Sequence, residues 1–91
     1  SFRSKVENND VWKVHQRAYK KYFARIRSGL MTKHEFEVWS RQAADLRDAA
    51  LEPYARAESE EERQRIAQEL AEALNEAWKE KQRRVLKIYE K

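Results

Sequence analysis

The amino-acid sequence predicts an all-α fold, in which three helices pack in an elongated antiparallel arrangement with a long C-terminal helix. Charged residues make up 40% of the 91 residues, and glycine and proline occur once each, which is typical of long helices. Three Ser/Thr-x-x-Glu motifs, the pattern of a helix N-terminal capping box, begin at Ser4, Thr32 and Ser59. Apolar residues after each motif recur at steps of three and four, as on one helix face. Together these observations predict a single helical domain over 1–91, with helices at about 4–28, 33–52 and 59–89.

The first helix is expected to begin near Ser4, with an alternative start at Asn8 to Asp10, where short polar side chains also cap helices. Gly29 is expected to end it, because glycine adopts the left-handed conformation after a helix C-terminus at little cost. Its apolar stripe comprises Val11, Trp12, His15, Ala18, Tyr19, Tyr22, Phe23 and Ile26. We expect most of these side chains to belong to the core.

The second helix starts at the Thr32 capping box and carries apolar residues close to every 3.5 positions. These residues are Phe36, Trp39, Ala43, Leu46 and Ala50. Pro53 lacks an amide hydrogen and clashes with the preceding turn, so the helix is expected to stop or kink near Leu51.

The third helix is expected to span about 45 Å, whereas a compact chain of this size has a radius of gyration of only about 12 Å. Its end should therefore project beyond the core of one chain. The apolar residues Val85, Ile88 and Tyr89 would then be exposed unless a second copy or the first helix covers them. We expect the chain to form a homo-oligomer.

The net charge of +4 is unevenly distributed along the chain. Residues 11–34 contain seven basic residues and no aspartate or glutamate, whereas residues 35–76 contain twelve acidic and five basic residues. A run of one charge sign on a helix repels itself unless an anion or an acidic surface lies against it. The basic segment is therefore the best indication of a partner.

Five basic residues of the first helix are predicted to contact nucleic acid or an acidic protein surface: Lys13, Arg17, Lys20, Lys21 and Arg25. Against phosphates such residues would act by counterion release, without sequence selectivity. Tyr19 or Tyr22, at the edge of this row, would be placed to stack on unpaired bases. The competing interpretation is that the acidic middle of the same chain neutralises the row.

No pattern in the sequence indicates catalysis, a cofactor or a metal. His34-Glu35 begins like a zinc-binding H-E-x-x-H helix, but Val38 occupies the position of the second histidine. Asp45 and Asp48 lie one turn apart, as paired carboxylates on solvated helix faces often do. The chain has no cysteine, and no apolar run approaches the roughly 20 residues that span a membrane. We therefore expect a non-enzymatic cytoplasmic protein without cofactor or metal, which contacts no membrane.

The segment 22–32, YFARIRSGLMT, continues through Glu35-Phe36, Trp39, Ala43 and Arg47-Asp48. Over roughly residues 1–50 this pattern resembles the C-terminal helical part of an uncharacterised bacterial family from Firmicutes genomes and their mobile elements. In that family a cysteine zinc ribbon precedes the helical part, and this chain lacks the ribbon and adds the long third helix. The resemblance implies a mobile-element setting and no site residues. Since the chain starts at Ser1, we expect it to be a piece of a larger protein.

These observations favour a non-catalytic helical binding module of a phage or mobile element, which contacts nucleic acid or an acidic protein surface through its basic first helix. Two alternatives remain open. One is a helical oligomerisation or scaffold domain, and the other is a small phage-type protein inhibitor of a bacterial nucleic-acid enzyme.

Overall fold

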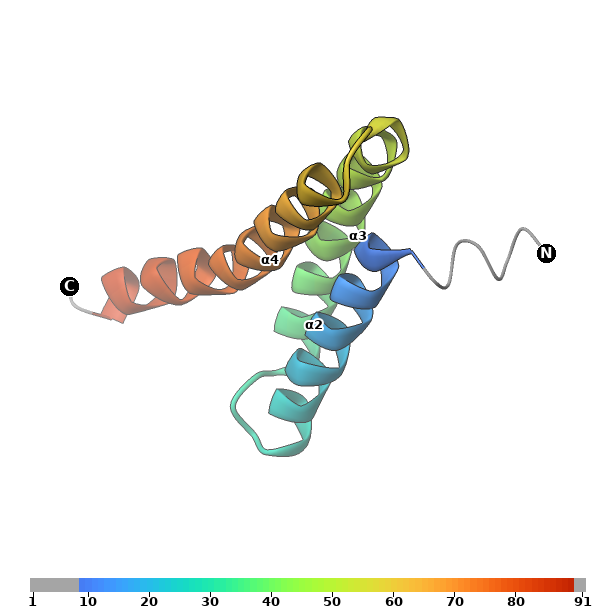
Figure 1. Cartoon of the computed structure of the whole chain (residues 1–91). Helices are drawn as coiled ribbons and strands as arrows, with labels where there is room; N and C mark the ends of the chain where they lie inside the picture. Colours follow the sequence, from blue (N-terminus) through green and yellow to red (C-terminus); the bar gives the residue numbers. More distant parts are fainter. Residues whose placement is uncertain (1–8, 90–91) are drawn as a thin grey trace.

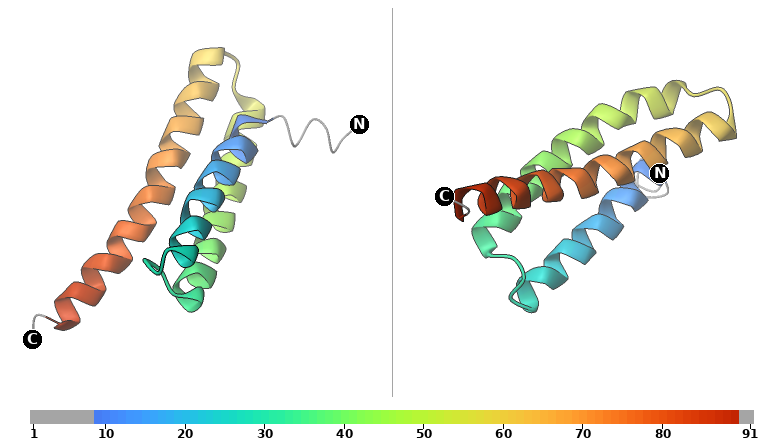
Figure 2. Two further views of the ribbon diagram at one scale, coloured as in Figure 1. Left: turned by 90° about the horizontal axis from the view of Figure 1, so that it is seen from below. Right: turned by 90° about the vertical axis from the view of Figure 1, so that its left-hand side faces the viewer.

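The computed structural model describes the backbone of residues 9–89 and the side chains of residues 9–78. It contains three helices, α2 (Asp10–Arg27), α3 (Lys33–Arg56) and α4 (Glu60–Tyr89), and no strand within residues 9–89 (Figure 1). Helices α2 and α3 lie side by side in opposite directions, and α4 returns across them (Figure 2). The C-terminal half of α4 extends away from the α2–α3 pair, and the molecule measures 49 × 24 × 16 Å. The predicted all-α class and elongated three-helix arrangement are confirmed.

Helix α2 begins later than its first predicted start. Asn9 has an extended backbone (φ −71°, ψ 137°), and its side-chain oxygen accepts a 2.7 Å hydrogen bond from the Val11 amide. The prediction of a helix continuous from Ser4 is therefore wrong, and the alternative start at Asn8 to Asp10 is confirmed. The Ser4 motif itself lies outside the described residues.

Gly29 ends α2 as predicted, in a left-handed conformation with φ 77°. The Leu30 amide donates to the Arg25 carbonyl at 2.8 Å, and the Gly29 amide donates to the Ile26 carbonyl at 3.1 Å. These two bonds form a Schellman motif, which satisfies carbonyls that the helix end would leave unpaired. The turn directs the chain back so that the buried Met31 joins the core.

Helix α3 starts at the predicted capping box. The Thr32 hydroxyl accepts from the Glu35 amide at 3.1 Å, and the Glu35 carboxylate accepts from the Thr32 amide at 3.0 Å. Its C-terminus differs from the prediction, because the helix continues through Pro53 to Arg56. Pro53 lies in the last turn, and the next residue, Tyr54, donates a 3.0 Å hydrogen bond to the Asp10 carboxylate of α2. This contact between helices helps to compensate for the one backbone hydrogen bond that proline removes.

Helix α4 starts as predicted, with Ser59 before its first residue. The Ser59 hydroxyl accepts from the Glu62 amide at 3.1 Å. The Glu62 carboxylate accepts from the amide of Glu58 at 3.3 Å, one residue before the position expected in a capping box. The acidic residues at this end therefore act as helix-start residues, since they complement the partial positive charge of the N-terminus.

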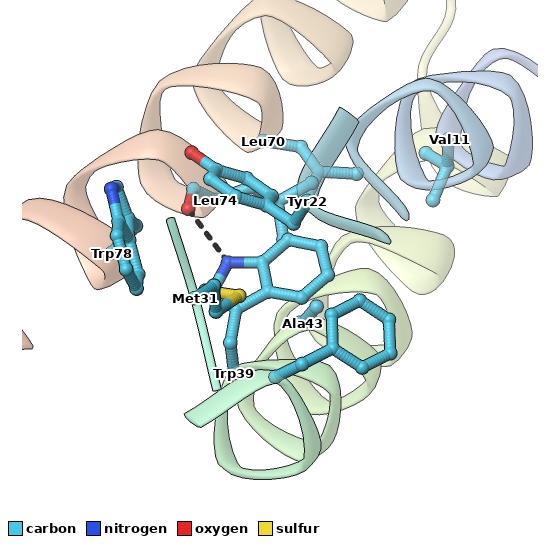
Figure 3. Packing of buried hydrophobic residues seen from close by; sticks show 9 residues of the cluster. Val11, Tyr22, Met31, Trp39, Ala43, Leu70, Leu74 and Trp78 are labelled. Carbon is cyan, nitrogen blue, oxygen red and sulfur yellow. Dashed lines mark hydrogen bonds between the residues drawn. The ribbon is translucent and has the colours of Figure 1, made fainter. Parts of the chain in front are cut away.

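The core lies where the three helices meet, and Trp39 is at its centre (Figure 3). The Trp39 side chain is 1% exposed, and its indole N–H donates to the Leu74 carbonyl of α4 at 3.2 Å. The Tyr22 ring of α2 packs against it, with ring centroids 4.3 Å apart. The buried core residues are Val11, Tyr22, Met31, Phe36, Trp39, Ala43, Leu70, Leu74 and Trp78. Aromatic rings from all three helices thus hold the bundle together.

Candidate functional site

Four of the five predicted binding residues lie on one exposed face of α2. We refer to Lys13, Arg17, Lys20 and Lys21 as the basic row, and all four are exposed. Their spacing of three and four residues aligns them along the helix, on the side away from the buried Val11 and Tyr22. From Lys13 to Lys21 the row extends about 12 Å along the helix axis.

Arg25, the fifth predicted residue, is placed differently. It is half-buried, and its guanidinium carbon lies 5.4 Å from the Tyr22 ring centroid and 5.6 Å from the Trp78 ring centroid. Arg25 therefore packs between α2 and α4 as a cation over two aromatic rings. The structure groups it with the core edge and not with the basic row.

The acidic middle of the chain pairs with its own arginines. The salt bridges among residues 9–78 are Arg47–Asp48, Arg56–Glu52, Arg63–Glu60 and Arg65–Glu62. Within this described part, none of these salt bridges includes a member of the basic row. The positive charge of the row thus remains available on the surface.

A groove between α2 and α4 runs along one side of the basic row. One section of about 200 Å³ is lined by Arg17 and Lys21 on one wall and Asn75 on the other, over a floor that includes Ala71. An adjoining section of about 300 Å³ shares Arg17 and Ala71 and continues to Lys13. Amide side chains of α4 line the wall opposite the basic residues: Gln64, Gln68 and Asn75.

A buried hydroxyl orients one of these amides. Burial raises the pKa of Tyr22 above its usual value, while the nearby Arg25 charge acts in the opposite direction. The hydroxyl donates to the Asn75 side-chain oxygen at 3.0 Å. The amide nitrogen of Asn75 therefore retains its hydrogens as donors at the groove, where they add to the cationic donors of Arg17 and Lys21. This wall suits an anion.

The aromatic stripe of α2 divides into buried and exposed rings. Tyr22 is 1% exposed, whereas Tyr19 and Phe23 are 41% and 46% exposed. Trp12, His15 and Tyr19 follow one another along the edge facing α3, with successive ring centroids 6.1 and 6.3 Å apart. Of the two tyrosines considered for base stacking, only Tyr19 is accessible.

His15 lies half-buried in this edge, as predicted. Burial lowers the pKa of His15, and the positive charge of Arg47 lowers it further, while Asp48 acts in the opposite direction. The guanidinium of Arg47 itself stacks over the Trp12 ring, 4.2 Å from its centroid. The fold thus favours the neutral form of His15.

The free energy of unfolding is expected to fall as the pH drops from about 7.5 to 5.5. The unfolded chain, in which His15 titrates near pH 6.5, binds the proton more tightly than the folded protein does. Stability from this group is therefore complete above about pH 6.5 and is lost as the pH falls through the lower folded pKa. Thermal denaturation across this range should show a smaller loss for His15→Gln. His34→Gln, which changes the exposed histidine, is the control and should keep the wild-type loss.

No catalytic or metal centre is assembled in the described part of the chain. Among residues 9–78, no three histidine, aspartate or glutamate side chains gather closely enough to hold a metal ion. His34 and Asp45 are exposed, and Asp48 pairs with Arg47 at 3.0 Å. None of the helices in the described range combines the length and apolar character needed to cross a membrane.

A family model, described as a family of unknown function (DUF6076), matches residues 1–77 of the chain. The chain belongs to this family. The DUF6076 match covers α2, α3 and α4 as far as Ala77, so it includes the basic row and both walls of the groove. No curated protein and no solved structure matches the chain.

The structure adds site residues of this DUF6076 member that sequence reasoning did not identify. These are the groove amides Gln64, Gln68 and Asn75 and the exposed ring of Phe23. The amides recur at steps of four and seven along α4, next to Ala67 and Ala71. That stripe of amides and alanines, set beside the leucine stripe, is the signal that would have indicated a polar groove there.

Proposed function

We propose that this protein is a non-catalytic helical binding module that contacts nucleic acid through the basic row of α2. The observation that supports the proposal is that four cations line one exposed helix face and form no salt bridge within residues 9–78. Such a face gains affinity for a polyanion by releasing the counterions that surround phosphates. The setting in a bacterial phage or mobile element, and in the cytoplasm, rests on the resemblance and belongs to the proposal.

The groove beside the row supports an anionic partner as well. Its α2 wall provides Lys13, Arg17 and Lys21, and its α4 wall provides the Asn75 amide donors. Phosphate oxygens accept hydrogen bonds from all of these groups. Contacts of this kind position a backbone without reading bases, so the binding should depend weakly on sequence.

The test is a salt titration of binding to a fluorescently labelled 20-nucleotide single strand and to a 20-base-pair duplex. Four phosphate contacts predict slopes of log affinity against log salt of about −3.6 for duplex and about −2.8 for single strand. Affinity should therefore fall about 100-fold between 50 and 200 mM salt. Absence of binding to both probes at 50 mM salt would refute nucleic-acid binding.

The same measurement separates the alternatives. An acidic protein surface as the partner predicts that polyglutamate of equal charge competes as well as the oligonucleotides do. An oligomerisation or scaffold domain predicts concentration-dependent light scattering and no binding to either nucleic-acid probe. An inhibitor of a nucleic-acid enzyme predicts tight binding to the enzyme and only weak, salt-sensitive binding to the probes.

A further inference from the structure

We infer that Tyr19 and Phe23 form a stacking platform for unpaired bases, so that the nucleic acid held by the basic row is single-stranded; this inference rests on the proposed function. The two side chains are 41% and 46% exposed, although each belongs to the apolar stripe of α2. Core packing uses Tyr22 from the same stripe and leaves these two rings at the surface. A partner with flat apolar faces would cover them.

The two rings are held in a defined orientation. They are parallel within 8°, and their centroids lie 6.4 Å apart. Phe36 of α3 is 7% exposed and meets both rings edge-on, at 5.1 Å from Tyr19 and 5.9 Å from Phe23. Phe36 in turn lies 5.9 Å from the central Trp39. The platform is therefore braced from the core side, which lowers the ordering cost of binding.

Charge identifies the occupant. On the helix surface Phe23 neighbours Lys20 three residues before it and Arg27 four residues after it, and both are exposed. The only acidic residue of α2 is Asp10 in its first turn, where it accepts from Tyr54. Apolar rings between cations suit a ligand with alternating planar faces and negative charges. Single-stranded nucleic acid has this chemistry, whereas a duplex keeps its base faces stacked inside.

The experiment compares a double variant without the rings, Tyr19→Leu with Phe23→Leu, against a ring-retaining control, Tyr19→Phe with Phe23→Tyr. Leucine keeps apolar contact with Phe36 but offers no π face. The affinity of the leucine variant for a 20-nucleotide single strand should fall about 5- to 150-fold per stacked base. Its affinity for the 20-base-pair duplex and its salt slope should stay within twofold of wild type. The control should bind both probes as wild type does.

Other results would overturn the inference. Unchanged single-strand affinity in the leucine variant, with the duplex still bound, would refute stacking while leaving the proposed function intact. Loss of a wild-type dimer in the leucine variant, measured by light scattering, would show that a second copy covers the rings. Failure of the wild type to bind either probe would instead refute the proposed function. If the leucine variant melts at a much lower temperature, the single ring deletions Tyr19→Leu and Phe23→Leu are measured separately against the same prediction.

Discussion

Replacing Trp39 by alanine is expected to destabilise the protein by about 3 to 5 kcal/mol, the cost typical of removing a buried large aromatic side chain. The side chain is 1% exposed, packs 4.3 Å from Tyr22, and donates to the Leu74 carbonyl. Small domains have total stabilities of only about 5 to 15 kcal/mol, so much of the margin is lost. Thermal denaturation followed by circular dichroism should show a melting temperature lowered by tens of degrees.

Trp12→Ala is the matched control, since it deletes the same side chain from the same bundle. Trp12 is only half-buried, where it packs against His15 and under Arg47. We expect this variant to cost about 1 to 2 kcal/mol, and Trp39→Phe to cost a similar amount because it keeps most of the apolar contact. Equal melting temperatures for Trp39→Ala and Trp12→Ala would contradict the placement of Trp39 at the centre.

The second large effect is expected from reversing three charges of the basic row together, in the variant Arg17→Glu, Lys20→Glu, Lys21→Glu. Each neutralised phosphate contributes about tenfold in affinity at 50 mM salt, so the variant should bind a 20-nucleotide strand about 1,000-fold more weakly. Its melting temperature should change by only a few degrees, because these side chains are exposed and form no salt bridge within residues 9–78. Fluorescence anisotropy and thermal denaturation measure the two quantities.

A second triple variant controls for net charge: Arg41→Glu, Arg56→Glu, Arg65→Glu. It changes the charge by the same amount at exposed positions of α3 and α4, outside the basic row. It should bind the strand within about tenfold of wild type, the difference coming from long-range repulsion alone. Similar losses in both variants would show that total charge, and not this face of α2, governs binding. Arg25 remains unchanged in both, because its reversal would also disturb its packing over Tyr22 and Trp78.

Most helix boundaries could be predicted from the sequence, because the signals are local. The Thr32 box, the Ser59 start and the left-handed Gly29 each depend on residues within one turn. The C-terminus of α3 could not be predicted in this way. Pro53 argues locally for an earlier stop, but Tyr54 reaches Asp10, 44 residues away, and the helix extends to Arg56.

Predictions about the end of α4 lie outside the described side chains. They concern the apolar residues Val85, Ile88 and Tyr89 and the C-terminal basic residues Lys79, Lys81, Arg83, Arg84, Lys87 and Lys91. The backbone of α4 continues to Tyr89, as the apolar spacing predicted. Coverage of this stripe by a second copy stays a prediction, which light scattering can test.

The sequence by itself determined the helical class, the three segments and the acid-free face of α2, since composition, capping and periodicity act within a few residues along the chain. Only the tertiary structure decided how that face is divided. It placed Arg25 between Tyr22 and Trp78, left Tyr19 and Phe23 at the surface, and opened a groove toward α4. The periodicity of one helix indicates which side is apolar. Which of those residues is covered depends on where neighbouring helices cross it, and that is set by packing between residues distant in the chain.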